Sequence, residues 1–110
     1  MQDVLPEERR YWDLITEKAA ELAHRYGFQR IDLPILEYTE LYQRGVGEGS
    51  DFFVQKEMYT LEESEGVTLT MRPEFTAGFM RAYIQNGMSN WPQPVKLYTI
   101  GPAFRRERQQ

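Results

Sequence analysis

The residues best suited to chemistry lie in two short segments. The first runs from Thr70 to Thr76 and reads TMRPEFT. We expect a strand to end there and a helix to begin at Pro73, because proline is favoured at the first helical position. The Glu74 carboxylate and the Thr76 hydroxyl could then hydrogen-bond a small cation such as an α-ammonium group. The alternative is helix capping, since acidic side chains are common in a first helical turn.

The second segment is Phe104–Arg108, which reads FRRER. If it is a strand, Arg105 and Glu107 point to the same face, because side chains alternate along a strand. The planar guanidinium of an arginine can bond two oxygens of one phosphate. The pair could therefore hold a ligand that carries a phosphate. The alternative is a charged, exposed strand end.

Other candidate sites are weaker. The chain has no Cys and a single His, which excludes a thiolate metal site, a His cluster and a Cys–His nucleophile. His24 lies near the end of an expected helix, where solvent or the helix dipole accounts for it. The glycine-rich stretch Gly45–Asp51 lacks the spacing of either common phosphate-binding loop and favours a surface loop.

The candidate segments need a scaffold, which begins with an amphipathic helix over Pro6–Tyr26 that stops at Gly27. Its apolar residues recur every three or four positions and predict one buried stripe: Tyr11, Leu14, Ile15, Ala19, Leu22, Ala23 and Tyr26. Phe28–Glu37 is expected to be extended. Pro34 interrupts any ladder there, so this segment should lie at a sheet edge or an interface. A short helix capped by Thr39 should follow, up to Arg44.

The rest of the scaffold alternates strands and helices. We expect strands at Glu57–Leu61 and Thr68–Arg72, joined by the polar turn Glu62–Gly66. A helix is predicted over Pro73–Gln85 and is ended by Asn86-Gly87. Two more strands are predicted around a Gly-Pro turn, at Val95–Gly101 and Ala103–Arg108. The order predicts an α+β fold in which helices flank an antiparallel sheet.

Composition narrows the class of protein. A chain of 110 residues predicts one domain, and 41% apolar residues argue against disorder. No apolar run approaches the roughly 20 residues of a membrane span, and the N-terminus has no signal-peptide pattern. The net charge of −4 argues against a stand-alone nucleic-acid binder. We therefore expect a cytoplasmic protein with no membrane partner.

Several pieces in register resemble the N-terminal part of the catalytic domain of histidyl-tRNA synthetases, a class II aminoacyl-tRNA synthetase family. Residues 26–37 resemble motif 1, and residues 72–77 resemble the RPE-x-T-A signature. Residues 95–108 resemble the start of motif 2, with Phe104-Arg-x-Glu107 matching its FRxE pattern. The matching letters are YGF at 26–28, RGVGE at 44–48, KEMY at 56–59, RPE at 72–74 and IGP at 100–102.

This resemblance implies a histidine–tRNA ligase. It would activate histidine with ATP and Mg²⁺ to histidyl-adenylate, then transfer it to tRNA(His). Glu74 and Thr76 would bind the histidine α-amino group. Arg105 would bind the ATP α-phosphate and act in catalysis, and Glu107 would lie near adenine. Pro34 and the motif 1 segment would lie at a homodimer interface.

The sequence departs from the family pattern in places. Phe75 stands where the family usually has glycine, and Arg106 and Gln109 also differ from the common pattern. The chain ends within motif 2, so we expect a fragment without the anticodon-binding domain that is weakly active or inactive alone. Two alternatives are a non-catalytic relative such as the ATP phosphoribosyltransferase regulatory subunit, and a structural dimerisation module.

Overall fold

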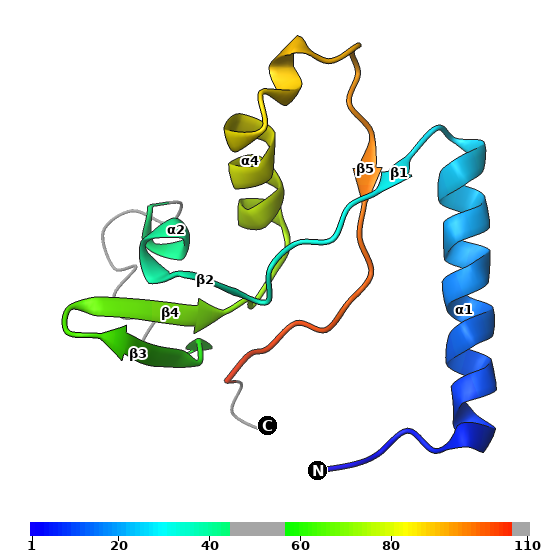
Figure 1. The fold of residues 1–110 in the computed structure, drawn as a ribbon. Helices are drawn as coiled ribbons and strands as arrows, with labels where there is room; N and C mark the ends of the chain where they lie inside the picture. The colour runs from blue at the N-terminus through cyan, green and yellow to red at the C-terminus, as the bar shows by residue number, and fades with distance from the viewer. Residues whose placement is uncertain (45–56, 107–110) are drawn as a thin grey trace. The chain divides into compact units, whose positions relative to one another are not determined.

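The computed structural model describes residues 1–44 and 57–106, and it divides into two compact units. The first unit comprises residues 1–32 and 93–100, and the second comprises residues 33–92 and 101–110. Each unit is described by itself, with the labels of Figure 1. The predicted loop Gly45–Asp51 and the candidate Glu107 lie outside the described residues.

The first unit is dominated by helix α1, Pro6–Arg25. Pro6 occupies its first turn, and the Glu8 carboxylate accepts a hydrogen bond from the Leu5 N–H at 3.4 Å. The helix ends where the chain turns through Gly27 at φ +79°, a left-handed conformation that favours glycine. The predicted helix and its stop are therefore confirmed.

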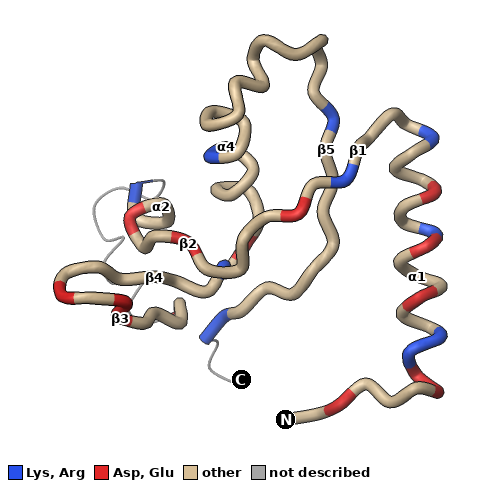
Figure 2. The backbone as a smooth tube through the Cα atoms, in the orientation of Figure 1, with Lys and Arg blue, Asp and Glu red and all other residues tan. Residues whose placement is uncertain are grey.

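The predicted burial of the α1 stripe is wrong, because no residue of α1 is buried. Its large apolar side chains are more than half exposed: Tyr11, Trp12, Leu14, Ile15 and Leu22. Acidic and basic residues are interspersed along the helix (Figure 2). Periodicity identifies an apolar face, but it does not say whether any part of the described chain covers that face.

A two-stranded sheet completes the first unit. Strand β1, Gln29–Arg30, pairs with β5, Leu97–Tyr98, and the pairing is parallel. The strand predicted at Val95–Gly101 is thus much shorter than expected. The ladder ends soon after β1, where the Ile31 N–H donates to the Tyr98 carbonyl at 3.0 Å. A strand continues only as far as its residues pair with those of the neighbouring strand, and only two residues of β1 are paired.

The second unit contains an antiparallel sheet in the order β2-β4-β3 (Figure 1). Its strands are β2 (Leu36–Tyr38), β3 (Thr60–Ser64) and β4 (Val67–Met71). Glu37 lies opposite Thr70 in the register of β2 and β4. β2 is an edge strand that begins two residues after Pro34, as the proline predicts. The α+β class with a small antiparallel sheet is confirmed.

Three short helical elements accompany this sheet: α2 (Thr39–Gln43), α4 (Thr76–Gln85) and the 3-10 turn η1 (Met88–Asn90). Thr39 does not cap α2 as predicted; it is the first helical residue, and its hydroxyl pairs with the Thr70 hydroxyl at 2.9 Å. The helix predicted from Pro73 begins at Thr76 instead. The Glu74 side chain bonds the first helical N–H groups, which places Glu74 before the helix.

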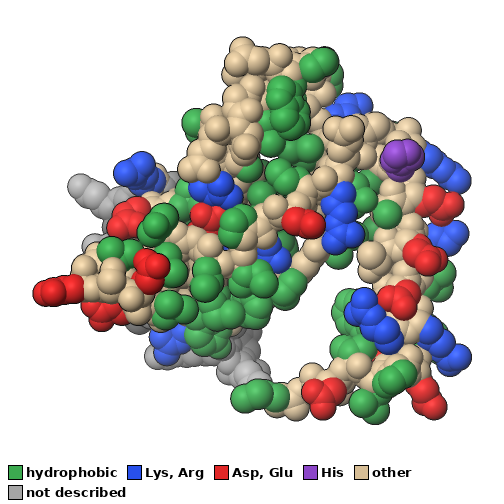
Figure 3. Space-filling view, in the orientation of Figure 1, with side chains coloured by type: hydrophobic (Ala, Val, Ile, Leu, Met, Phe, Trp, Pro, Cys, Tyr) green, Lys and Arg blue, Asp and Glu red, His purple; other side chains and the backbone are tan. Residues whose placement is uncertain are grey.

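The core of the second unit combines apolar and polar side chains. The buried apolar residues are Leu33, Tyr42, Met58, Ala82 and Met88, and the buried polar ones are Glu37, Thr39, Thr70 and Arg72. Hydrophobic side chains also gather on the visible surface over the β2–β4–β3 sheet (Figure 3). No helix in the described ranges has both the length and the apolar composition needed to cross a membrane.

Candidate active site

The two candidate segments lie side by side in the second unit, although about thirty residues separate them. The Phe104 N–H donates to the Arg72 carbonyl at 2.9 Å. The Arg105 Nε–H donates to the Pro73 carbonyl at 3.1 Å. These two bonds place the Arg105 guanidinium next to the residue that precedes Glu74. Arg105, a cationic group suited to phosphate, is therefore bonded to the residue next to Glu74, whose carboxylate is suited to ammonium.

Glu74 caps helix α4. Its Oε2 accepts from the Thr76 N–H, and its Oε1 accepts from the Ala77 N–H at 3.2 Å. The capping alternative is thus observed, but capping does not use all of the acceptor sites of the Glu74 carboxylate. A carboxylate offers about four lone-pair sites, so each oxygen can accept one more donor. The cap fixes the direction in which the remaining lone pairs point, and Thr76 is exposed.

Arg105 does not lie on the predicted strand Ala103–Arg108, because residues 103–106 are irregular. The strand prediction is therefore wrong for residues 103–106, and the predicted partner Glu107 lies outside the described residues. Backbone bonds hold the segment instead: the Arg106 N–H donates to the Glu57 carbonyl at 2.8 Å, and the Arg106 guanidinium lies 5.9 Å from the Tyr59 ring centroid. The irregular backbone follows the end of β4 rather than adding a strand to it.

Sequence reasoning missed a role for Arg72, which is only 6% exposed. Its Nη1 donates to the Leu33 carbonyl and its Nε donates to the Pro102 carbonyl, both at 2.8 Å. The Phe75 ring lies 4.8 Å from the guanidinium. A signal was present, since position 72 shares a strand face with the buried Thr70, and a charge on a buried face needs partners.

The second unit, which contains Glu74, also has buried and half-buried polar side chains that pair with one another. The Arg81 guanidinium contacts the Glu37 carboxylate at 2.8 Å, and Glu37 is 8% exposed. Tyr42 packs against Met58 in the same core. Burial raises the pKa of Tyr42 to about 12, and the negative charges of Glu37 and Glu74 act in the same direction. The phenol therefore stays neutral over the physiological range.

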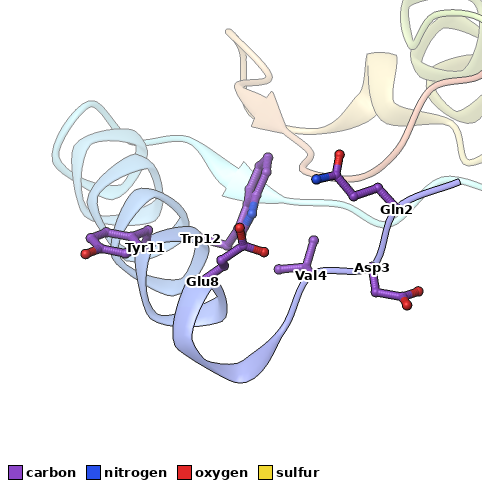
Figure 4. A pocket seen from close by; sticks show the side chains of 6 residues that line it. All are labelled: Gln2, Asp3, Val4, Glu8, Tyr11 and Trp12. Carbon is purple, nitrogen blue, oxygen red and sulfur yellow. The ribbon is translucent and has the colours of Figure 1, made fainter.

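Other parts of the described chain have fewer of the features expected of an active site. A depression of about 430 Å³ in the first unit is lined by the N-terminal segment and α1, at Gln2, Asp3, Val4, Glu8, Tyr11 and Trp12. Figure 4 shows the side chains of Glu8, Trp12 and Val4 next to one another, whereas Tyr11 points away from them. His24 is exposed in the last turn of α1. Within residues 1–44 and 57–106, no three His, Cys, Asp or Glu side chains are grouped to hold a metal ion.

Comparison with known proteins gives the family. The histidyl-tRNA synthetase family model matches residues 1–110. The chain belongs to the histidyl-tRNA synthetase family. A histidine–tRNA ligase of Anoxybacillus flavithermus is 53% identical over 110 residues, which are 99% of this chain and 26% of that protein. The chain therefore spans about a quarter of the length of the curated relatives that it matches.

Solved structures agree with this membership. The apo histidyl-tRNA synthetase of S. aureus superposes with a TM-score of 0.79 at 38% identity, over 96% of this chain and 24% of that one. A Bacillus halodurans protein described as an ATP phosphoribosyltransferase regulatory subunit/histidyl-tRNA synthetase also gives 0.79, at 26% identity, over 98% of this chain and 27% of that one. The fold is thus similar both to that of a histidyl-tRNA synthetase and to that of the protein described as a regulatory subunit.

Proposed function

We propose that this chain forms part of the active site of a histidine–tRNA ligase. The observation that carries the proposal is the Arg105 Nε bond to the Pro73 carbonyl, which holds a cationic group beside Glu74. Activation of an amino acid by ATP needs this pairing, because the ammonium group and the α-phosphate must be bound together. The identity to curated histidine–tRNA ligases supports histidine as the amino acid.

The first proposed step is adenylation. A carboxylate oxygen of histidine attacks the α-phosphorus of ATP, a new P–O bond forms, and pyrophosphate leaves with the electrons of the broken bond. Glu74 and Thr76 bind the α-amino group, and Arg105 binds the α-phosphate and stabilises its developing charge. Catalysis is then by positioning and electrostatics rather than by a protein nucleophile. In the second step, the terminal ribose hydroxyl of tRNA(His) attacks the carbonyl carbon of histidyl-adenylate, so that the histidyl group is transferred and AMP leaves.

ATP enters with Mg²⁺, which supplies charge neutralisation at the phosphates. Arg105 fits the phosphate because its guanidinium can donate to two oxygens. Glu107, which lies outside the described residues, would contact adenine.

The proposal includes a homodimer formed through residues 26–37, the motif 1 segment, with Pro34 at the interface. Apolar side chains beside Pro34 support it: Ile35 and Leu36 are each about 40% exposed, and Tyr38 is 61% exposed. Exposed apolar groups on an edge strand favour association. Residues 72–77 and 95–108 would carry the amino-acid and ATP contacts, and the whole protein would act in the cytoplasm.

The test is histidine-dependent ATP–pyrophosphate exchange by the full-length gene product. We expect exchange that requires histidine and falls by about 100-fold or more in Arg105→Ala, the order of loss when one transition-state donor is removed. Arg9→Ala, an exposed change in α1, is the matched control and should retain the full rate. Exchange that is absent in the wild type, or unaffected by Arg105→Ala, contradicts the proposal.

The likeness to the Bacillus halodurans protein gives a second candidate, a non-catalytic histidine-binding subunit. The same sample separates the two. Calorimetric titration with histidine that shows binding, together with no exchange and no ATP binding, favours the regulatory function. ATP binding that is lost in Arg105→Ala favours the ligase.

A further inference from the structure

Arg72 connects three segments of the second unit that are distant in sequence. Through its guanidinium it holds the Leu33 and Pro102 carbonyls, and through its own backbone it holds two more groups. The Arg72 N–H donates to the Ile35 carbonyl at 2.8 Å, and the Arg72 carbonyl accepts from the Phe104 N–H. Four hydrogen bonds thus join this residue to the segments before β2 and before Arg105.

Gly101 and Phe75 both lie close to the Arg72 guanidinium. A Cβ atom at Gly101 would lie 2.5 Å from Arg72 Nη2, so glycine at 101 gives the guanidinium its space. Phe75, the residue that departs from the family pattern, lies against the same guanidinium at 4.8 Å. An aromatic face attracts a cation at this distance and also excludes water from it. Both residues therefore limit where the guanidinium can lie.

We propose that Arg72 is a positioning residue that sets the place of Arg105 relative to Glu74. It holds both sides of the site: Pro73 and Glu74 follow it directly in the chain, and Pro102 and Phe104 are bonded to it. Lysine cannot replace it, because one ammonium group cannot reproduce the fork that bonds two carbonyls in fixed directions. The expected effect on catalysis rests on the proposed function. The clamp, meaning the four hydrogen bonds that Arg72 makes to the two neighbouring segments, does not depend on it.

The decisive experiment combines exchange kinetics with a double-mutant cycle in the full-length gene product. Arg72→Lys should lower kcat of histidine-dependent exchange by about 10–100-fold, as expected when a reacting group is misplaced by about 1 Å. KM for histidine should change less than about threefold, because Glu74 keeps its cap on α4. Arg81→Lys is the matched control, since it alters a half-buried arginine whose guanidinium pairs with Glu37 and Gln85.

The cycle tests whether Arg72 acts through Arg105. In an Arg105→Lys background, Arg72→Lys should cost less than about threefold, because the group that it positions is gone. A full, additive loss in that background overturns the proposal, as does an Arg72→Lys enzyme with normal kcat. Gly101→Ala is an independent variant that keeps both arginines, and it should lower kcat in the same way by displacing the guanidinium.

Amide hydrogen exchange, measured without substrates, tests the clamp separately from the reaction. The Phe104 amide should exchange faster in Arg72→Lys than in the wild type, and Arg81→Lys should leave it unchanged. Unchanged protection in Arg72→Lys overturns the clamp whatever the enzyme activity. If the wild type shows no pyrophosphate exchange but Phe104 loses protection, the proposed function fails and the clamp stands.

Discussion

Helix α1 and the second unit differ in how far their ion pairs are exposed to solvent. On α1, Arg9 and Asp13 form an ion pair at 3.2 Å between side chains that are more than half exposed. In the second unit, Glu37 and Arg81 pair at 2.8 Å with side-chain exposures of 8% and 21%. Water already solvates the first pair, so its formation gains little. The second pair is largely removed from water, so each partner depends on the other.

The same contrast holds for candidate chemistry. α1 presents a long row of side chains, but they are exposed. The second unit fixes Arg72 and Glu74 by bonds to the backbone, and it does so with few buried apolar residues. Regular secondary structure alone therefore does not make a site. Buried polar groups with defined partners orient the side chains that could act.

The largest expected effect is on the buried ion pair. Glu37→Ala should destabilise the protein by about 3–5 kcal/mol, because it leaves the Arg81 charge without its carboxylate. Urea unfolding measures the change. A loss below about 1 kcal/mol, the range of exposed pairs, would remove the distinction drawn between the two regions.

The next effect concerns the Tyr42 phenol at alkaline pH. Its pKa is raised from 10.0 to about 12 in the folded chain, chiefly by burial. Folding therefore favours the protonated form, so this contribution is complete below pH 10 and is lost as the pH rises to 12. The loss amounts to about 2–3 kcal/mol over those two units. Unfolding midpoints measured from pH 9 to 12 should fall more steeply in the wild type than in Tyr42→Phe, and parallel curves would contradict the expectation.

A smaller effect is expected at the hydroxyl pair of Thr39 and Thr70. Thr70→Val should cost about 1–3 kcal/mol, because it leaves the buried Thr39 hydroxyl without its partner. Replacing both threonines by valine should recover part of that loss, since neither hydroxyl is then left unpaired. The three unfolding free energies form a cycle, and strict additivity would show that the pair is not coupled.

The smallest effect is expected on α1. Asp13→Ala removes the carboxylate of an exposed pair and should change stability by less than about 0.5 kcal/mol. The measurement is the same urea midpoint as for Glu37→Ala. A loss of stability comparable with that of Glu37→Ala would show that α1 is covered in the intact protein.

Features that depend on local interactions were predicted from the sequence, whereas features that depend on contacts between distant residues were often missed. Pro6 and Gly27 are local signals, and the bounds of α1 follow from them. Family resemblance predicts functional roles for residues in the RPE and FR segments, and the structure shows that the two segments are joined by the Phe104–Arg72 bond. Glu74 was assigned both a capping and a binding role, and the cap is observed.

The errors came from contacts that span the chain. Thr39 looked like a helix cap, but its partner Thr70 lies 31 residues away. The stripe on α1 predicted burial, yet amphipathicity is a property of one element and burial needs a second. Arg72 received no role because its carbonyl partners lie on two other segments, and carbonyl positions cannot be deduced from side-chain types.

The span of the Arg72 contacts has a consequence for the order of folding. The β3–β4 hairpin closes through the short turn at Gly66, whereas the guanidinium bonds reach 30 and 39 residues along the chain. Closing longer loops costs more entropy, so local pairings tend to form first. We expect the hairpin to be an early structure and the arginine bonds to be among the last. A chain that has only its hairpin would then be folded in part and still lack the site.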